Sequence, residues 1–169
     1  MAGRVDLRAA AVDDQGFLKR VFFEVAGERF LPLGLGAQAL EMLLGQQYRA
    51  RQIGYGDAFP QAATSVILHD GDPAGEIIVC NEQLGEATAV RIVSITVLEG
   101  KRNRGIGAAV LSRVIADAHE RGAGCVRLSV QVDNAAARRL YDRLGFIVDP
   151  APDEESDYVA AFIEMHRSL

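Results

Sequence analysis

Hydrophobic and polar positions follow two different periods along this chain. Apolar residues recur at helical spacing in two segments after a short N-terminal strand, whereas alternating or β-branched runs prevail from residue 64 onward. The alternating pattern predicts strands at Val5–Arg8, Thr64–His69, Ala74–Asn81, Ala87–Val97, Cys125–Val132, Phe146–Val148 and Tyr158–His166. Helical spacing predicts helices between Asp13 or Asp14 and Gly27, and at Ala37–Arg51, Gly105–Arg121 and Asn134–Leu144. This order predicts a mixed sheet covered by helices.

Glycine, proline and acidic residues mark the predicted connections. Gly27 is predicted to end the first helix, and Gly54–Pro60 to form a loop after the second. Asn81–Glu86 is predicted to be a turn, and Asp149–Asp157 an acidic loop that contains proline. A length of 169 residues without internal repeats predicts one domain over residues 1–169.

Charge narrows the range of ligands. The net charge is −5, which disfavours nucleic acid or an anionic membrane as the main partner. Residues 101–143 nevertheless carry nine Lys or Arg and only four Asp or Glu, so the remainder of the chain is strongly acidic. The charge pattern therefore predicts a short anionic ligand on the basic segment, and the acidic remainder is compatible with a cationic acceptor.

Cysteine and histidine usage gives no sign of a disulfide framework or a metal site. Cys80 and Cys125 both lie in predicted strands, where reduced buried thiols are expected. His69, His119 and His166 are scattered without the spacing of metal ligands, so no metal is predicted. Neither a signal peptide nor a transmembrane run is evident, which predicts a cytoplasmic protein.

The strongest chemical signal lies where the strand at 87–97 leads into the helix at 105–121. Lys101, Arg102, Arg104, Gly105 and Gly107 occupy this junction. Backbone N–H groups at a helix N-terminus bind anions, and glycines let an anion approach them. The segment is not a Walker loop, since it lacks the first glycine and the Ser or Thr that follows the lysine. A formal dinucleotide fingerprint at residues 34–39 follows a proline-containing segment and no convincing strand.

Two motifs in the second half resemble one known family. Arg102-x-x-Gly105-x-Gly107 after a β-branched strand is similar to the acetyl-CoA signature of the GNAT superfamily of N-acyltransferases. The segment from Asn134 to Phe146 resembles the same family's Asn-x-x-Ala-x-x-Leu-Tyr-x-x-x-Gly-Phe pattern. The resemblance implies a GNAT-like α+β fold, with a mixed, mostly antiparallel sheet of about seven strands and about four helices. It also implies acyl transfer from acetyl-CoA, as cosubstrate, to an amine.

The same resemblance implies roles for individual residues. Tyr141 is the implied general acid for the leaving thiolate, and Asn134 a contact to the coenzyme A arm as well as a helix N-cap. Backbone groups of strand 87–97 would pair with the pantetheine, and the amide near Val97 would polarise the thioester carbonyl. The implied cofactor-binding residues are Ile95, Thr96, Val97, Arg102, Asn103, Arg104, Gly105, Ile106, Gly107, Ala108 and Asn134.

The general base and the acceptor remain open at this point. Many relatives carry an acidic residue in the strand that corresponds to 87–97, but this chain has none there. Carboxylates elsewhere are candidates for the base: Glu24, Glu28, Glu76 and Glu82. We expect the acceptor pocket to involve the two N-terminal helices, the loop that follows them and the acidic loop. A small-molecule amine is the favoured acceptor, and a peptide acceptor or a non-catalytic acyl-CoA-binding module is the alternative. The chain is also compatible with a homodimer.

Overall fold

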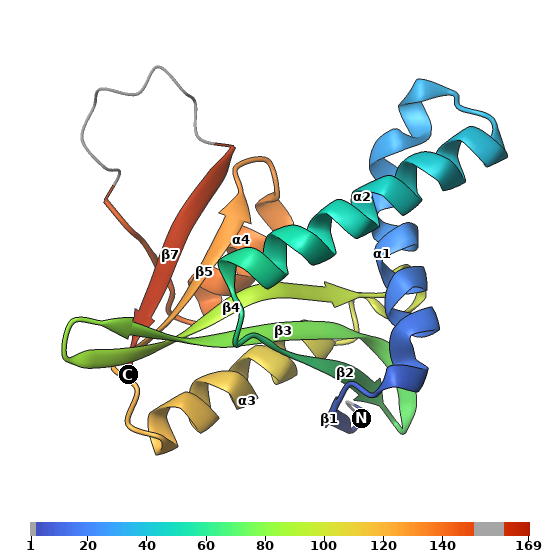
Figure 1. Ribbon diagram of the computed structural model, residues 1–169. Coiled ribbons are helices and arrows are strands. Elements are labelled where there is room, and N and C mark those ends of the chain that lie inside the picture. Colours follow the sequence, from blue (N-terminus) through green and yellow to red (C-terminus); the bar gives the residue numbers. More distant parts are fainter. Residues whose placement is uncertain (1–2, 151–160) are drawn as a thin grey trace. The chain divides into compact units, whose positions relative to one another are not determined.

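The computed structural model describes residues 3–150 and 161–169 (Figure 1). The described chain forms two compact units, one made of Met1–Val79 and Ser94–Val110, the other of Cys80–Val93 and Leu111–Leu169. Three elements continue from one unit into the other: β3 (Asp72–Leu84), β4 (Ala87–Val97) and α3 (Ile106–Glu120).

Strand pairing orders seven strands as β1-β2-β3-β4-β5-β7-β6. The β4–β5 pair is parallel, whereas the β1–β2, β2–β3, β5–β7 and β6–β7 pairs are antiparallel. The sheet is therefore mixed and mostly antiparallel, and with α-helices α1 to α4 it confirms the predicted fold class.

The first unit joins a pair of antiparallel strands to two long helices. β1 (Val5–Ala9) pairs with β2 (Ala63–His69), and α1 (Gln15–Phe30) lies beside α2 (Ala37–Ala58) in Figure 1. Their buried residues are few: Leu18 and Val21 on α1, and Leu44 on α2. Both helices therefore leave most of their surface outside the core.

Two predicted helix ends in this unit are wrong. α1 runs through Gly27, where an added Cβ would lie 3.8 Å from the Leu44 side chain, so this glycine packs between the helices. α2 also continues past Gly54 and Gly56 to Ala58. A glycine inside a helix costs only about 1 kcal/mol relative to alanine, which tertiary contacts can outweigh.

The second unit holds the C-terminal strands and α4. Its elements are β5 (Cys125–Gln131), α4 (Ala135–Arg143), β6 (Ile147–Val148) and β7 (Phe162–Ser168). Alternate residues of β5 are buried, as the sequence pattern predicts for a strand with one covered face: Val126, Leu128 and Val130.

Some predicted boundaries move in the structure. β3 extends to Leu84, which leaves only residues 85 and 86 before β4 and shortens the predicted turn. β7 starts at Phe162, while the first residues of the predicted strand Tyr158–His166 lie outside the described residues. Most of the predicted acidic loop lies outside them as well. None of the helices in the described part is long and apolar enough to cross a membrane.

Candidate functional site

The C-terminal end of β4 packs closely against the start of β3. The β2–β3 register shifts between Ile67 and Leu68, which leaves Ala74 as an extra residue of β3. The Ala74 carbonyl accepts a hydrogen bond from Leu98 N at 2.9 Å. A Cβ on Gly75 would meet the Thr96 carbonyl oxygen at 2.0 Å, so only glycine permits this approach. These contacts fix the backbone at the predicted pantetheine-binding residues, Ile95, Thr96 and Val97.

The loop between β4 and α3 presents backbone N–H groups in one short turn. After a 3-10 turn at Glu99–Lys101, Asn103 and Gly105 adopt left-handed φ angles of 60° and 76°. Left-handed residues are typical of turns whose backbone N–H groups form an anion-binding concavity. α3 then begins at Ile106, whose side chain is buried and anchors the turn. This segment brings together the predicted residues 102–108.

The first turn of α3 supplies further N–H donors. The N–H of Ala109 bonds to the Gly105 carbonyl at 3.0 Å, as the start of the helical pattern. The N–H groups of Ile106, Gly107 and Ala108 precede that bond and have no intrahelical acceptor. The positive end of the helix dipole lies at the same place, so the turn favours a phosphate or another anion.

The three cations of the loop differ in their partners. Arg102 donates from Nε to the Val97 carbonyl at 3.1 Å and forms an ion pair with Glu28 at 3.2 Å. Lys101 lies 3.7 Å from Asp72. Arg104 is exposed and makes no ion pair with the residues that the structure describes. Arg102 therefore holds the loop to the end of β4, and Arg104 is the cation most available to a ligand.

α1 binds this loop through two carboxylates, which sequence reasoning treated as candidate bases. Glu24 accepts a hydrogen bond from the Glu99 N–H at 2.6 Å, and Glu28 pairs with Arg102. Their four-residue spacing places both carboxylates on one face of α1. This spacing is the sequence signal that could have predicted that both contact the same neighbouring segment. Both carboxylates thus position the loop.

A third candidate base, Glu76, lies in a buried ion pair. Its side chain is 3% exposed, and its Oε1 accepts from Arg51 Nη2 at 2.5 Å. The same nitrogen donates to Ser94 Oγ on β4 at 3.0 Å. Burial lowers the pKa of Arg51, but Glu76 outweighs that effect, so the pKa is raised overall and Arg51 stays charged. Glu76 is therefore engaged as the partner of a buried cation.

A pocket of about 320 Å³ opens between α1 and α2 beside this ion pair. We call it the α1–α2 pocket; the residues that define its character are Phe22, Arg29, Phe30, Arg51 and Tyr55. The Arg51 guanidinium lies 5.4 Å from the Phe22 ring centre and 5.0 Å from that of Tyr55. Both aromatic rings lie close enough to stabilise the cation.

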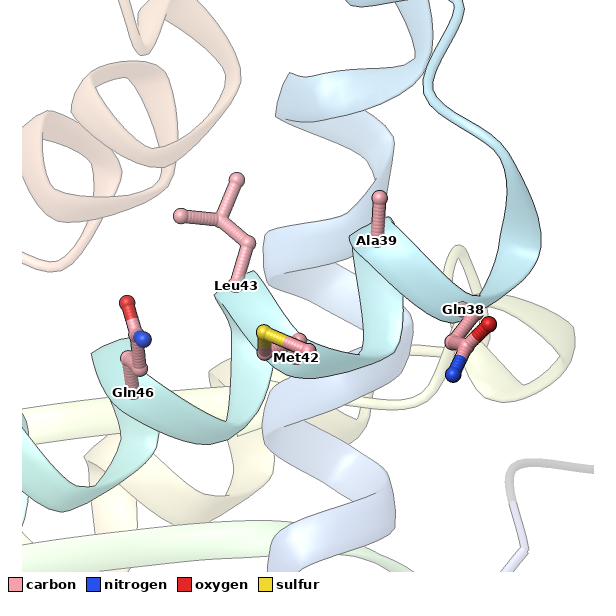
Figure 2. Close-up of a pocket in the computed structure, with 5 residues that line it drawn as sticks. All are labelled: Gln38, Ala39, Met42, Leu43 and Gln46. Carbon is pink, nitrogen blue, oxygen red and sulfur yellow. The ribbon is translucent and has the colours of Figure 1, made fainter.

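A separate hollow follows α2 alone. Figure 2 shows the five residues that line it, all carried by that one helix: Gln38, Ala39, Met42, Leu43 and Gln46. None of the five carries a charge or a nucleophile, so we assign this hollow no part in the chemistry.

Tyr141 and Asn134 belong to α4, in the second unit. Tyr141 is 7% exposed, and its ring lies 5.8 Å from that of Phe146. Burial raises the pKa of its hydroxyl above the ordinary value, so the group stays protonated at neutral pH. Asn134 accepts from the Ala137 N–H at 3.1 Å and caps α4, as the sequence predicts.

The fourth candidate base, Glu82, is held by arginines in the second unit. Its Oε1 lies 2.5 Å from Arg91 Nε, and Arg127 is 3.7 Å from its other oxygen. Arg91 also pairs with Glu164 at 3.1 Å, and Arg127 with Asp149 at 3.3 Å. Sequence reasoning missed this network, in which arginines and carboxylates from several strands neutralise one another.

The cysteines and histidines offer no additional chemistry. Cys80 is buried, and desolvation raises the pKa of its thiol, which disfavours a reactive thiolate. His69 is buried, and His166 pairs with Asp149. Across residues 3–150 and 161–169, His, Cys, Asp and Glu form no group that could hold a metal ion.

Comparison with known proteins identifies the family. Residues 37–146 match the sequence profile of the acetyltransferase (GNAT) family. The chain belongs to the GNAT family. An uncharacterized N-acetyltransferase of Methanocaldococcus jannaschii is 33% identical over 103 residues, which cover 59% of this chain and 42% of that protein. The match therefore spans less than half the length of this curated relative.

Solved structures share the GNAT fold of this chain. The PaiA N-acetyltransferase of Thermoplasma acidophilum, in complex with coenzyme A, superposes with a TM-score of 0.69 at 15% identity, over 98% of this chain and 99% of that one. Naa50 of Arabidopsis thaliana, in complex with the bisubstrate analogue CoA-Ac-MVNAL, superposes with a TM-score of 0.62 at 19% identity, over 98% and 99%. At these identities the likeness establishes the fold alone, while the profile match over residues 37–146 confirms the predicted family resemblance.

Proposed function

We propose that this GNAT-family chain is an acetyl-CoA-dependent N-acetyltransferase that acts on a primary amine of a small molecule. The observation that carries the proposal is the β4–α3 loop, whose left-handed residues and free helix N–H groups form an anion cradle. Family membership supports the predicted enzyme class, an acyl-CoA-dependent acyltransferase. Because β3, β4 and α3 run through both units, we propose one catalytic domain over residues 1–169.

The cradle would bind the pyrophosphate of the cosubstrate. Backbone N–H groups of residues 103–108 donate to the phosphate oxygens, and Arg104 adds charge from the surface. The Arg102 N–H is held by the Glu99 carbonyl at 3.1 Å, so Arg102 contributes through its place in the turn. The β4 residues Ile95–Val97 pair with the pantetheine through their backbone, and the amide at Val97 polarises the thioester carbonyl. Asn134 contacts the coenzyme A arm while it caps α4.

The reaction is direct transfer in a ternary complex. The amine nitrogen forms a bond to the thioester carbonyl carbon, the carbon–sulfur bond breaks, and the Tyr141 hydroxyl protonates the leaving thiolate. The proton that the nitrogen loses as it becomes the amide returns to Tyr141. A buried tyrosine with a raised pKa is fully protonated at neutral pH, which suits this role. The proton lost by the acceptor ammonium passes to water, since Glu24, Glu28, Glu76 and Glu82 are each engaged by an arginine or a backbone N–H.

A thiol-release assay tests this function. Acetyl-CoA is supplied with a panel of primary amines and short peptides, free thiol is followed continuously, and the acetylated product is identified by mass spectrometry. We expect thiol release that depends on a small amine and an N-acetylated product. Turnover with peptides alone would indicate a peptide N-acetyltransferase, and binding of coenzyme A without any turnover would indicate a binding module.

A matched pair of variants separates chemistry from folding. Tyr141→Phe removes the proposed proton donor but keeps the buried ring, whereas Tyr48→Phe removes a hydroxyl on α2 that has no role in the proposal. Loss of turnover in the first variant only, with coenzyme A binding retained in both, is the expected outcome.

A further inference from the structure

One face of α2 points away from α1 and stays exposed in the described chain. Leu44, the buried residue of α2, contacts α1 near Gly27, and Met42 lies about 200° around the helix axis from Leu44. The side chain of Met42 is 61% exposed, and a hollow of about 480 Å³ lies beside it. We call this stripe the Met42 face, which consists of Gln38, Ala39, Met42, Gly45, Gln46 and Arg49.

Exposed apolar side chains gather around this face. The described residues include eleven large hydrophobic side chains that are exposed, and five of them fall within residues 31–53: Leu31, Leu33, Leu35, Met42 and Ile53. Single exposed apolar residues are ordinary on a protein surface, whereas a group of them over one element marks an interaction site. The Met42 face and the connection before α2 therefore form a candidate protein-binding surface.

The pattern of the Met42 face is symmetric about Met42. Gln38 and Gln46 lie four residues before and after it, and Figure 2 shows Met42 between the two amides. Ala39 and Gly45 lie three residues before and after it. If two copies of α2 pack antiparallel about a two-fold axis at Met42, residues at equal distances before and after Met42 face each other. Each Gln38 amide then meets a Gln46 amide that can both donate and accept, and small residues face each other three positions away.

The charges beside this stripe are complementary in the same arrangement. Glu41 and Arg49 are exposed, and neither makes an ion pair with any residue that the structure describes. Arg49 leans back over Gly45, where an added Cβ would lie 4.0 Å from its Nη1. Helical side chains lean toward the N-terminus, so Glu41 reaches the level of Ala39, which faces Gly45 of the other copy. Each copy therefore brings its Arg49 to the other copy's Glu41, on the same side of the stripe.

We infer that the Met42 face binds a second copy of this chain, and that the two α2 helices pack antiparallel about a two-fold axis at Met42. Ile53 lies eleven residues after Met42, whereas α2 begins only five residues before it. The end of one α2 therefore passes the start of the other, and Ile53 reaches the exposed leucines of the other copy's α1–α2 connection. The inference is independent of the proposed function, because the Met42 face shares no residue with the β4–α3 loop or α4.

Sedimentation equilibrium of the full chain tests the association directly. We expect a monomer–dimer equilibrium within about 1–100 µM chain. Met42→Lys places two ammonium groups together at the two-fold axis and should raise the dissociation constant roughly tenfold or more. Val12→Lys is the matched control, since Val12 is 86% exposed and lies outside α2, and it should leave the constant unchanged. Circular dichroism checks that both variants keep the fold. A wild type that stays monomeric at the highest concentration, or equal effects of the two variants, would overturn the inference.

Charge reversal tests the antiparallel register. Arg49→Glu or Glu41→Arg alone places like charges opposite each other and should raise the dissociation constant roughly fivefold or more. The double variant restores opposite charges across the interface and should return to the wild-type value. Arg20→Glu, a reversal at an exposed site on α1, controls for net charge. A parallel pair keeps like charges opposite each other in every variant, so a dimer whose dissociation constant is the same in all of them would overturn the inference.

Discussion

Removal of the Arg51 charge is the sharpest test of the buried pair beneath the α1–α2 pocket. In Arg51→Met the aliphatic volume is largely kept, but the Glu76 carboxylate, 3% exposed, loses the cation that lies 2.5 Å away. Breaking a buried ion pair from one side costs about 3–5 kcal/mol, because an uncompensated charge stays in the interior. For a chain of this size each kcal/mol shifts the melting midpoint by about 2–4 °C, so the loss is roughly 6–20 °C.

Circular dichroism in the far ultraviolet provides the assay, since the chain contains no tryptophan. Urea unfolding of the wild type, Arg51→Met, Glu76→Met and the double variant forms a double-mutant cycle. The double variant should recover most of the stability, because both buried charges are gone. Arg4→Met breaks an exposed pair with Asp6 and should leave the midpoint unchanged. A loss of less than about 1 kcal/mol in the single Arg51→Met variant would show that the Glu76 charge is not stabilised mainly by Arg51.

Three further outcomes follow from the second unit. Tyr141→Phe should lower kcat by roughly 10²–10⁴-fold at unchanged coenzyme A affinity, as measured by thiol release and calorimetry. Asn134→Ala removes the α4 cap and should cost about 1 kcal/mol in urea unfolding, whereas Asn134→Asp should retain most of the stability. Burial favours the neutral form of Asp149, but hydrogen bonds from His166 and Arg127 outweigh it and lower its pKa. This stabilisation is present above about pH 4 and is lost as pH falls through the lowered pKa. The free energy of unfolding of the wild type should therefore fall more steeply below about pH 4 than that of Asp149→Asn, when both are measured by urea unfolding at several pH values. The same dependence on pH in both proteins would contradict this.

Short sequence patterns correctly predicted the strands that bury one face, as well as turns and helix caps that depend on neighbouring residues. The alternation of Val126, Leu128 and Val130 predicted β5, and all three are buried in the structure. The glycines and cations after residue 97 predicted the turn into α3. This prediction succeeded because the turn depends on local backbone conformation, such as the left-handed φ of Gly105, which glycine adopts readily. Asn134 likewise caps α4 as its sequence position predicts.

Contacts between distant segments could not be predicted in the same way. Gly27 lies inside α1 because it faces Leu44 of α2, which no local propensity reveals. Glu28 pairs with Arg102, which lies 74 residues away in sequence, and Glu76 pairs with Arg51 from another element. Each carboxylate had seemed a candidate base, and each is a structural partner of an arginine instead. Which carboxylates are free to accept protons depends on the tertiary fold.

We propose that the β4–α3 loop binds the cosubstrate. Titration of coenzyme A into isotope-labelled protein, followed by amide chemical shifts, tests it residue by residue. We expect the largest shifts at the N–H groups of residues 103–108, smaller ones at Ile95–Val97, and none along the α2 hollow of Figure 2. Saturable shifts that avoid the loop, or no shifts at millimolar coenzyme A, would contradict it.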